Sequence, residues 1–158
     1  MNLTKKRKKK GFTLIELMAV IAIIAILAAV LVPTVSGYIE RSKKTAVITQ
    51  VRNVVSAVET YNATAKSSDK LEVSTNPAKN PTLSEIREKV GADLLEAKSI
   101  NKLPKTVTLG AMQAINEDTN AIKDIKLDRD GILYEYKNTD SQKAYKNTSD
   151  SLPFTPAE

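Results

Sequence analysis

Residues 10–35 read KGFTLIELMAVIAIIAILAAVLVPTV, and this stretch decides how the chain is built. From Phe12 to Val35 it contains 24 residues, of which Glu16 alone carries a charge. A helix of that length rises about 36 Å, which is enough to cross a bilayer. An ionised carboxylate in such an apolar segment costs free energy unless another charge pairs with it. Glu16 therefore predicts a partner charge that the segment itself does not supply.

The positive charge of the chain is concentrated before this segment. Residues 5–10 hold six of the 24 Lys and Arg side chains, which leaves 18 basic residues against 18 acidic ones in the rest. A basic run can bind nucleic acid, but a neutral body gives that interpretation little support. Directly before a membrane-length apolar segment, the run indicates an end that stays in the cytoplasm.

The composition also excludes several kinds of chemistry. The chain has no Cys and no His, so it lacks disulfides, thiol nucleophiles, histidine bases and the usual zinc ligands. The spacing of Asp128, Asp130 and Gly131 invites a calcium loop, but Ile132 stands where an oxygen ligand would follow. A hairpin turn is the favoured interpretation. We expect no enzymatic activity, no metal site and no cofactor.

The segment differs from an ordinary secretory signal. Its apolar stretch is too long, and no Ala-x-Ala-like cleavage site followed by a polar mature start stands after it. A plain single-span membrane anchor is the simplest alternative. The junction Lys10-Gly-Phe-Thr-Leu-Ile-Glu16, however, resembles the processing motif of type IV prepilins. That resemblance implies cleavage between Gly11 and Phe12 by a prepilin peptidase, loss of the leader 1–11, and N-methylation of Phe12.

The resemblance also implies a function. Members of this family are structural subunits that leave the membrane and assemble with further copies of themselves into an extracellular type IV pilus. An assembly platform and motor, formed by other proteins, would drive that step. The precursor would span the cytoplasmic membrane, and no surface receptor can be named. Two alternatives stay open: a pseudopilin of a secretion or DNA-uptake machine, and a monomeric membrane-anchored binding module.

Within this interpretation Glu16 has a specific role. Cleavage would leave a positive amine on Phe12, four residues before Glu16, and residues i and i+4 lie on one face of a helix. The carboxylate could meet its own terminus or that of the next subunit. Because both charges would be desolvated in an apolar filament core, a wrong stagger would leave both unpaired. We expect the pair to set register and recruitment rather than raw stability.

The apolar segment continues into a longer helix. We predict one helix over residues 12–66, interrupted by Pro33, which removes a backbone donor, and by Gly37. These two residues predict a kink, and Pro33 can equally mark the exit from the membrane. The expected boundaries are a filament-core helix at 12–36 and a globular head at 37–158.

The head is expected to be α+β, with the long N-terminal helix packed on a small antiparallel sheet. Val47, Val51, Val54, Val58 and Tyr61 recur at spacings of four and three, which predicts one buried face on an amphipathic helix 37–66. The remaining expectations follow in chain order. We expect a loop and a second helix at 67–99, with the helix running from Thr82 to about Lys98. A sheet and tail are expected at 100–158, with strands at 106–109, 122–127 and 132–136, a turn at 128–131 and an irregular tail at 138–158.

Overall fold

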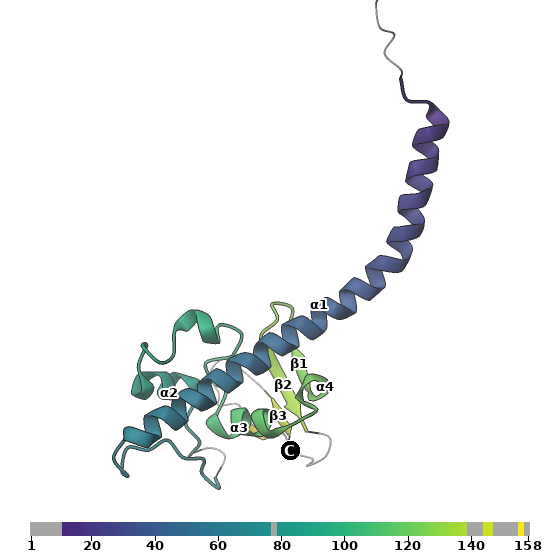
Figure 1. The fold of residues 1–158 in the computed structure, drawn as a ribbon. Helices are drawn as coiled ribbons and strands as arrows, with labels where there is room; N and C mark the ends of the chain where they lie inside the picture. Colours follow the sequence, from purple (N-terminus) through teal and green to yellow (C-terminus); the bar gives the residue numbers. More distant parts are fainter. Residues whose placement is uncertain (1–10, 77–78, 139–143, 147–154, 157–158) are drawn as a thin grey trace, which may run out of the picture. The chain divides into compact units, whose positions relative to one another are not determined.

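The computed structural model describes residues 11–76, 79–138, 144–146 and 155–156 (Figure 1). Residues 5–10, the basic part of the expected leader, lie outside the described residues. The chain divides into two compact units, Met1–Ile39 and Glu40–Glu158. The expected boundary between 36 and 37 stays a prediction. In chain order the elements are α1 (Leu14–Thr64), α2 (Leu83–Val90), the 3-10 helix η2 (Ala97–Ile100), α3 (Leu109–Glu117), α4 (Ala121–Asp124), β1 (Ile125–Leu127), β2 (Leu133–Lys137), β3 (Ala144–Lys146) and β4 (Thr155–Pro156).

Helix α1 has 51 residues and passes through Pro33 without ending. Because proline has no N–H, the carbonyl of Ala29 loses its helical donor there. Just after it, the hydroxyls of Thr34 and Ser36 donate to carbonyls four residues earlier, at 3.1 and 3.0 Å. Such back-bonding often bends helices. A kink at Pro33 and Gly37 stays a prediction.

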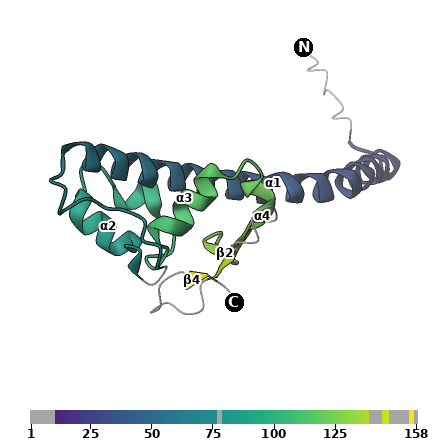
Figure 2. The same cartoon turned by 90° about the horizontal axis from the view of Figure 1, so that it is seen from below.

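In the second unit, α1 buries the face that its spacing predicts. Val47, Val51, Val54 and Val58 are all buried, and Tyr61 packs against the core at its edge. Figure 2 shows helices α2 and α3 and strand β2 on the same side of this half of α1. The largest fully buried side chains that complete the core come from those elements and their connections: Ile86, Leu95, Leu109, Met112, Ile115, Ile125, Leu133 and Tyr136.

The strands form one antiparallel sheet in the order β1-β2-β3-β4. Strands β1 and β2 are joined by the predicted turn, in which the Gly131 N–H donates to the Asp128 carbonyl at 3.1 Å. Gly131 has a φ of 75°, a left-handed conformation that glycine adopts without strain. The predicted fold class, a long helix packed on a small antiparallel sheet, is confirmed.

The predicted second helix is right at its start and wrong at its end. Thr82 caps α2 through the expected capping box, in which the Thr82 N–H donates to Glu85 Oε2 at 2.7 Å. The helix stops at Val90 instead of about Lys98, because Gly91 turns the chain with a φ of 90°. A non-helical segment then leads into η2.

Three expectations about the later chain are also wrong. The strand expected at 122–127 begins only at Ile125, because residues Ala121–Asp124 form helix α4. Residues 106–109 form no strand; Thr108 makes only an isolated bridge with Thr82 and then caps the unexpected helix α3 by accepting from the Ala111 N–H. The tail is not wholly irregular, because β3 and β4 extend the sheet. The other residues of the tail beyond 138 lie outside the described residues.

Candidate assembly site at the N-terminal segment

The carboxylate of Glu16 lies at the first turn of α1 and binds Thr13. Glu16 Oε2 accepts from both the backbone N–H and the hydroxyl of Thr13, each at 2.8 Å, and the Glu16 N–H donates to Thr13 Oγ1 at 3.3 Å. These reciprocal bonds are a capping box, which satisfies N–H groups that a helix start leaves unpaired. We did not predict this role, although the spacing Thr-x-x-Glu at the start of an apolar run carries the signal.

The capping box uses only half of the carboxylate. Both Thr13 bonds end on Oε2, and Oε1 accepts no hydrogen bond from a described residue. In the uncleaved chain the Phe12 nitrogen is part of a peptide bond, so no amine is present to pair with Glu16. Capping and pairing with a second charge are therefore compatible, because they use different oxygens.

Gly11 and Gly37 are not required by the local fold. Neither has a positive φ, and no atom lies within 4 Å of the position that an added Cβ would take. Phe12, beside Gly11, is 93% exposed. The local fold therefore gives no reason for a glycine at position 11.

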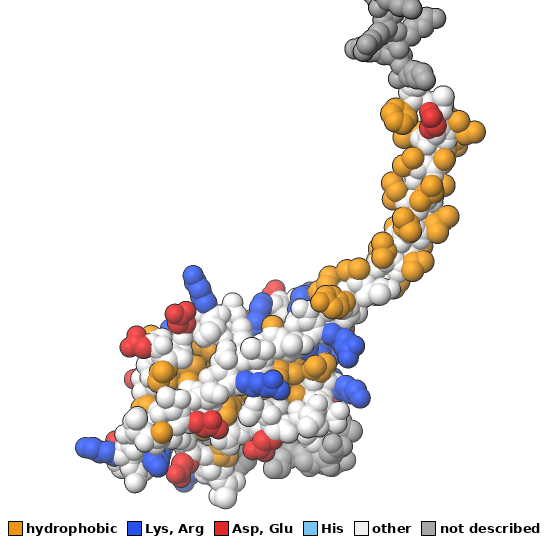
Figure 3. Space-filling model, in the orientation of Figure 1, with side chains coloured by type: hydrophobic (Ala, Val, Ile, Leu, Met, Phe, Trp, Pro, Cys, Tyr) orange, Lys and Arg blue, Asp and Glu red, His pale blue; other side chains and the backbone are white. Residues whose placement is uncertain are grey.

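The apolar part of α1 has no covering in the described chain. Every residue from 11 to 40 is exposed, and hydrophobic side chains cover the face of this segment seen in Figure 3. Among the described residues, α1 is the one helix that is long and apolar enough to cross a membrane. Contiguous exposed apolar surface of this extent marks a membrane or protein interaction site.

The head offers no comparable chemical site. Among the described residues, no three acidic side chains are grouped to hold a metal ion. The Asp128 carboxylate, weighed above as a calcium ligand, instead accepts the backbone N–H groups of Asp130 and Ile132 at 2.9 and 2.8 Å. Those bonds build the hairpin turn and confirm that interpretation.

Comparison with known proteins bears on this same segment. Residues 6–32 match the prokaryotic N-terminal methylation motif. A type IV major fimbrial protein FimA of Dichelobacter nodosus is 45% identical over 64 residues, and a second FimA of that organism is 49% identical over 55 residues. The N-terminal segment of this chain is similar to that of type IV major fimbrial proteins.

The pilin resemblance predicted from residues 10–16 is thereby confirmed, within limits of length. The two alignments cover 40% and 35% of this chain and the same shares of the relatives, so the match spans less than half of each protein. No solved structure matches the chain. Gly11, Phe12 and Glu16 lie inside the matched motif, whereas Pro33 and Gly37 follow it. The individual roles of these five residues stay predictions.

Proposed function

We propose that the chain is the structural subunit of a type IV pilus. One observation carries the proposal: the N-terminal methylation motif opens a fully exposed apolar segment, residues 12–35, whose single charge is Glu16. Burying each large apolar side chain of such a surface contributes roughly 1.5–3 kcal/mol. The membrane supplies that burial for the precursor, and parallel α1 helices of further copies supply it in the filament. The activity is structural rather than enzymatic.

Glu16 makes assembly into the filament selective for one stagger of neighbouring copies. Cleavage after Gly11 creates a cation on Phe12, and Glu16 Oε1 is the oxygen left to bind it. The two positions are four residues apart, or about 6 Å along a helix. A neighbour displaced by that distance brings its Phe12 amine level with Glu16. In the apolar interior a copy at another stagger leaves both charges unpaired, which is strongly unfavourable.

Cleavage is tested first, by intact-mass analysis of protein from the native host. We expect loss of residues 1–11 and the added mass of one methyl group. A chain that keeps the leader would overturn the proposal and support a monomeric membrane-anchored binding module. A cleaved chain that never forms long surface fibres under electron microscopy would instead favour a pseudopilin.

The role of Glu16 is tested by separating charge from capping. Glu16→Gln keeps a side chain that fits the capping box but removes the charge. Thr13→Ala keeps the charge and removes the cap, at about 1 kcal/mol. We expect Glu16→Gln to be cleaved but to yield few fibres by electron microscopy, and Thr13→Ala to assemble. The opposite ranking would assign Glu16 a purely local role.

A further inference from the structure

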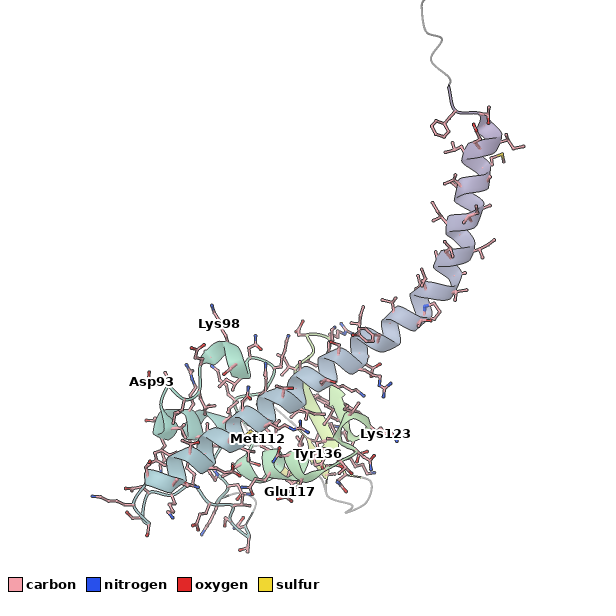
Figure 4. The ribbon with its side chains drawn as sticks, viewed as in Figure 1. Asp93, Lys98, Met112, Glu117, Lys123 and Tyr136 are labelled. Carbon is pink, nitrogen blue, oxygen red and sulfur yellow. The ribbon has the colours of Figure 1, made fainter. Side chains whose placement is uncertain are left out.

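Tyr38 is an exposed aromatic residue at the end of the apolar part of α1. It is 75% exposed, and it is the one aromatic residue between Phe12 and Tyr61. Its hydroxyl forms no hydrogen bond with a described residue. Figure 4 shows the side chains of this first part of α1 projecting from the helix on all sides. The described chain therefore provides neither packing for the ring nor a partner for the hydroxyl.

The surface of Tyr38 is continuous with that of the apolar segment. Leu31, Val35 and Tyr38 follow one another at spacings of four and three, which places them along one face of α1. Leu31 and Val35 are 56% and 48% exposed. In the proposed function this segment lies in the membrane before assembly. The surroundings of the Tyr38 ring are therefore set by where the bilayer ends along α1.

The charges on either side of the segment mark that end. Residues 17–39 carry no charge, and Glu16 and Glu40 flank them. As a helix these 23 residues rise about 35 Å, slightly more than the roughly 30 Å of a hydrocarbon core. Because a charged side chain is costly inside that core, the two acids lie near its two edges. Tyr38, two residues before Glu40, then lies at the edge nearer the head.

The chemistry of tyrosine suits this position. Its ring is apolar and its tip is polar, which is why tyrosine is enriched where hydrocarbon meets the lipid headgroups. We propose that Tyr38 anchors the precursor at the head-side surface of the bilayer, with its ring among the acyl chains and its hydroxyl bound to lipid carbonyl or phosphate oxygens. This rests on the proposed function and adds how the subunit is held before assembly.

The anchor also sets the depth of Glu16. The two residues are 22 positions apart, or about 33 Å along a helix. With Tyr38 at the head-side edge of the core, the Glu16 carboxylate lies at the opposite edge, where water reaches it. The charge of Glu16 therefore costs little in the precursor, and its cost arises only when the segment enters the apolar filament interior. Tyr38 is a positioning residue for Glu16.

Depth is tested first, with tryptophan as the probe. The chain has no tryptophan, so a single substitution introduces a unique fluorophore. Ile15→Trp and Tyr38→Trp place it at the two expected edges, and Leu27→Trp places it midway between them. Each full chain is reconstituted into phosphatidylcholine–phosphatidylglycerol vesicles whose lipids are brominated either near the glycerol or near the end of the acyl chain. We expect the shallow quencher to be stronger for the two edge variants and the deep quencher for Leu27→Trp.

The outcomes separate the anchor from the proposed function. A Tyr38→Trp ring quenched as deeply as that of Leu27→Trp would overturn the anchor. A Tyr38→Trp ring quenched by aqueous iodide and by neither lipid would also overturn it, and would leave the exposed ring for contact with another copy. If no variant is quenched by lipid, the chain does not enter the bilayer, and the membrane state in the proposed function fails together with the anchor.

A second experiment tests whether Tyr38 holds the segment in place. Ser36→Cys adds the only thiol of the chain, two residues to the membrane side of Tyr38. A membrane-impermeant maleimide added to the same vesicles labels this thiol only while it is outside the core. Tyr38→Ala lets the segment slide more, so labelling should be severalfold faster, and Tyr38→Trp should restore the slow rate. The rate for Ser42→Cys, beyond the core, corrects for the fraction of molecules with the head outside.

Ile39→Ala is the matched control for this experiment. It removes the neighbouring apolar side chain, which is 48% exposed, and leaves the aromatic ring in place. We expect Ile39→Ala to leave the labelling of Ser36→Cys unchanged. Equal acceleration by Ile39→Ala and Tyr38→Ala would overturn the anchor and assign the effect to lost apolar surface. Failure of Tyr38→Trp to restore the slow rate would overturn it as well.

Discussion

The side chain of Tyr136 connects several elements of the head. Its ring is buried and stacks on Tyr145, with ring centroids 6.1 Å apart. Its hydroxyl lies 3.1 Å from the Ala114 carbonyl and 3.2 Å from Asp118 Oδ2, either of which it can donate to, and it accepts from Asn138 Nδ2 at 3.0 Å. Strand β2 is thereby fastened to the end of α3.

Burial, with the nearby Asp118 carboxylate, raises the pKa of Tyr136 to about 12, although the Asn138 amide opposes the shift. In the unfolded chain the pKa is about 10. The folded state therefore holds its proton more tightly, so the stabilisation is complete below about pH 10 and is lost as the pH rises through about 12. We expect the melting temperature of the full chain in detergent to fall over that interval.

Tyr136→Phe should lower stability by about 1 kcal/mol at neutral pH through lost hydrogen bonds, and should flatten the alkaline fall. Some fall should persist, because burial also raises the pKa of Tyr145. Tyr134→Phe, at a 40% exposed ring, is the matched control and should keep the wild-type profile. An unchanged profile in Tyr136→Phe would show that another group governs the alkaline transition.

For single residues, the sequence predicted the importance of a charged side chain better than it predicted hydrogen bonds. Glu16 stood out because an acid in an apolar run is costly whatever the fold. Asn62 gave no comparable signal, yet its side-chain amide accepts from the Leu71 N–H at 2.8 Å and donates to the Leu71 carbonyl at 2.9 Å. These bonds fix the chain after α1, and they depend on a loop path that no local spacing reveals.

Among the elements, Gly91 decides where α2 ends. Its N–H donates to the Arg87 carbonyl at 3.0 Å, and its φ of 90° with ψ of 160° is a conformation that other residues rarely adopt. No atom lies within 4 Å of an added Cβ, so a substitution meets no steric contact. Any cost at this position is conformational.

Gly91→Ala should therefore lower the free energy of unfolding by about 1–3 kcal/mol, the usual cost of a strained backbone. Urea unfolding of the full chain in detergent, followed through the tyrosines, measures it. Gly37→Ala is the opposing control: Gly37 lies in α1 without a positive φ, and alanine is about 1 kcal/mol better there. If Gly91→Ala were neutral, the φ of 90° would not be what terminates α2.

The wrong strand at 106–109 has a physical explanation at the level of elements. Three β-prone residues suggested a strand, but Thr108 is a helix cap, and Leu109, Met112 and Ile115 then recur every three residues along α3. That spacing is visible in the sequence, but the prediction of a strand did not use it, and Gly110 lies within it. The structure shows why a glycine is there: an added Cβ would come within 2.7 Å of Asn80 Nδ2. Only the tertiary neighbour reveals that constraint.

For the whole molecule, the sequence was most informative where one physical effect dominates. The long helix and its buried face followed from the apolar pattern alone, because burial of Val47 to Val58 outweighs local preference. Strands β3 and β4 could not be predicted, since both are very short and depend on pairing across the sheet.

The last prediction concerns the charges on either side of the apolar segment. Six basic residues at 5–10 precede it, and Arg41, Lys43 and Lys44 follow it. Membrane orientation follows the side with more Lys and Arg close to the segment, so we expect the first group to keep the N-terminus in the cytoplasm and to place the head outside. Replacing all six residues at 5–10 with Gln leaves more Lys and Arg on the head side of the segment, and the head should then stay in the cytoplasm.

Protease added to intact spheroplasts or protoplasts shows on which side of the membrane the head lies, because an exported head is digested and a retained head is protected. The informative control adds Arg41→Gln, Lys43→Gln and Lys44→Gln to the Gln-substituted leader. With the basic residues removed from both sides of the apolar segment, the protease should again digest the head in part of the molecules. A head that is fully exported with the Gln leader alone would show that the apolar segment itself sets the orientation. Arg41, Lys43 and Lys44 therefore oppose export of the head, and we expect the six residues at 5–10 to outweigh them because they are more numerous.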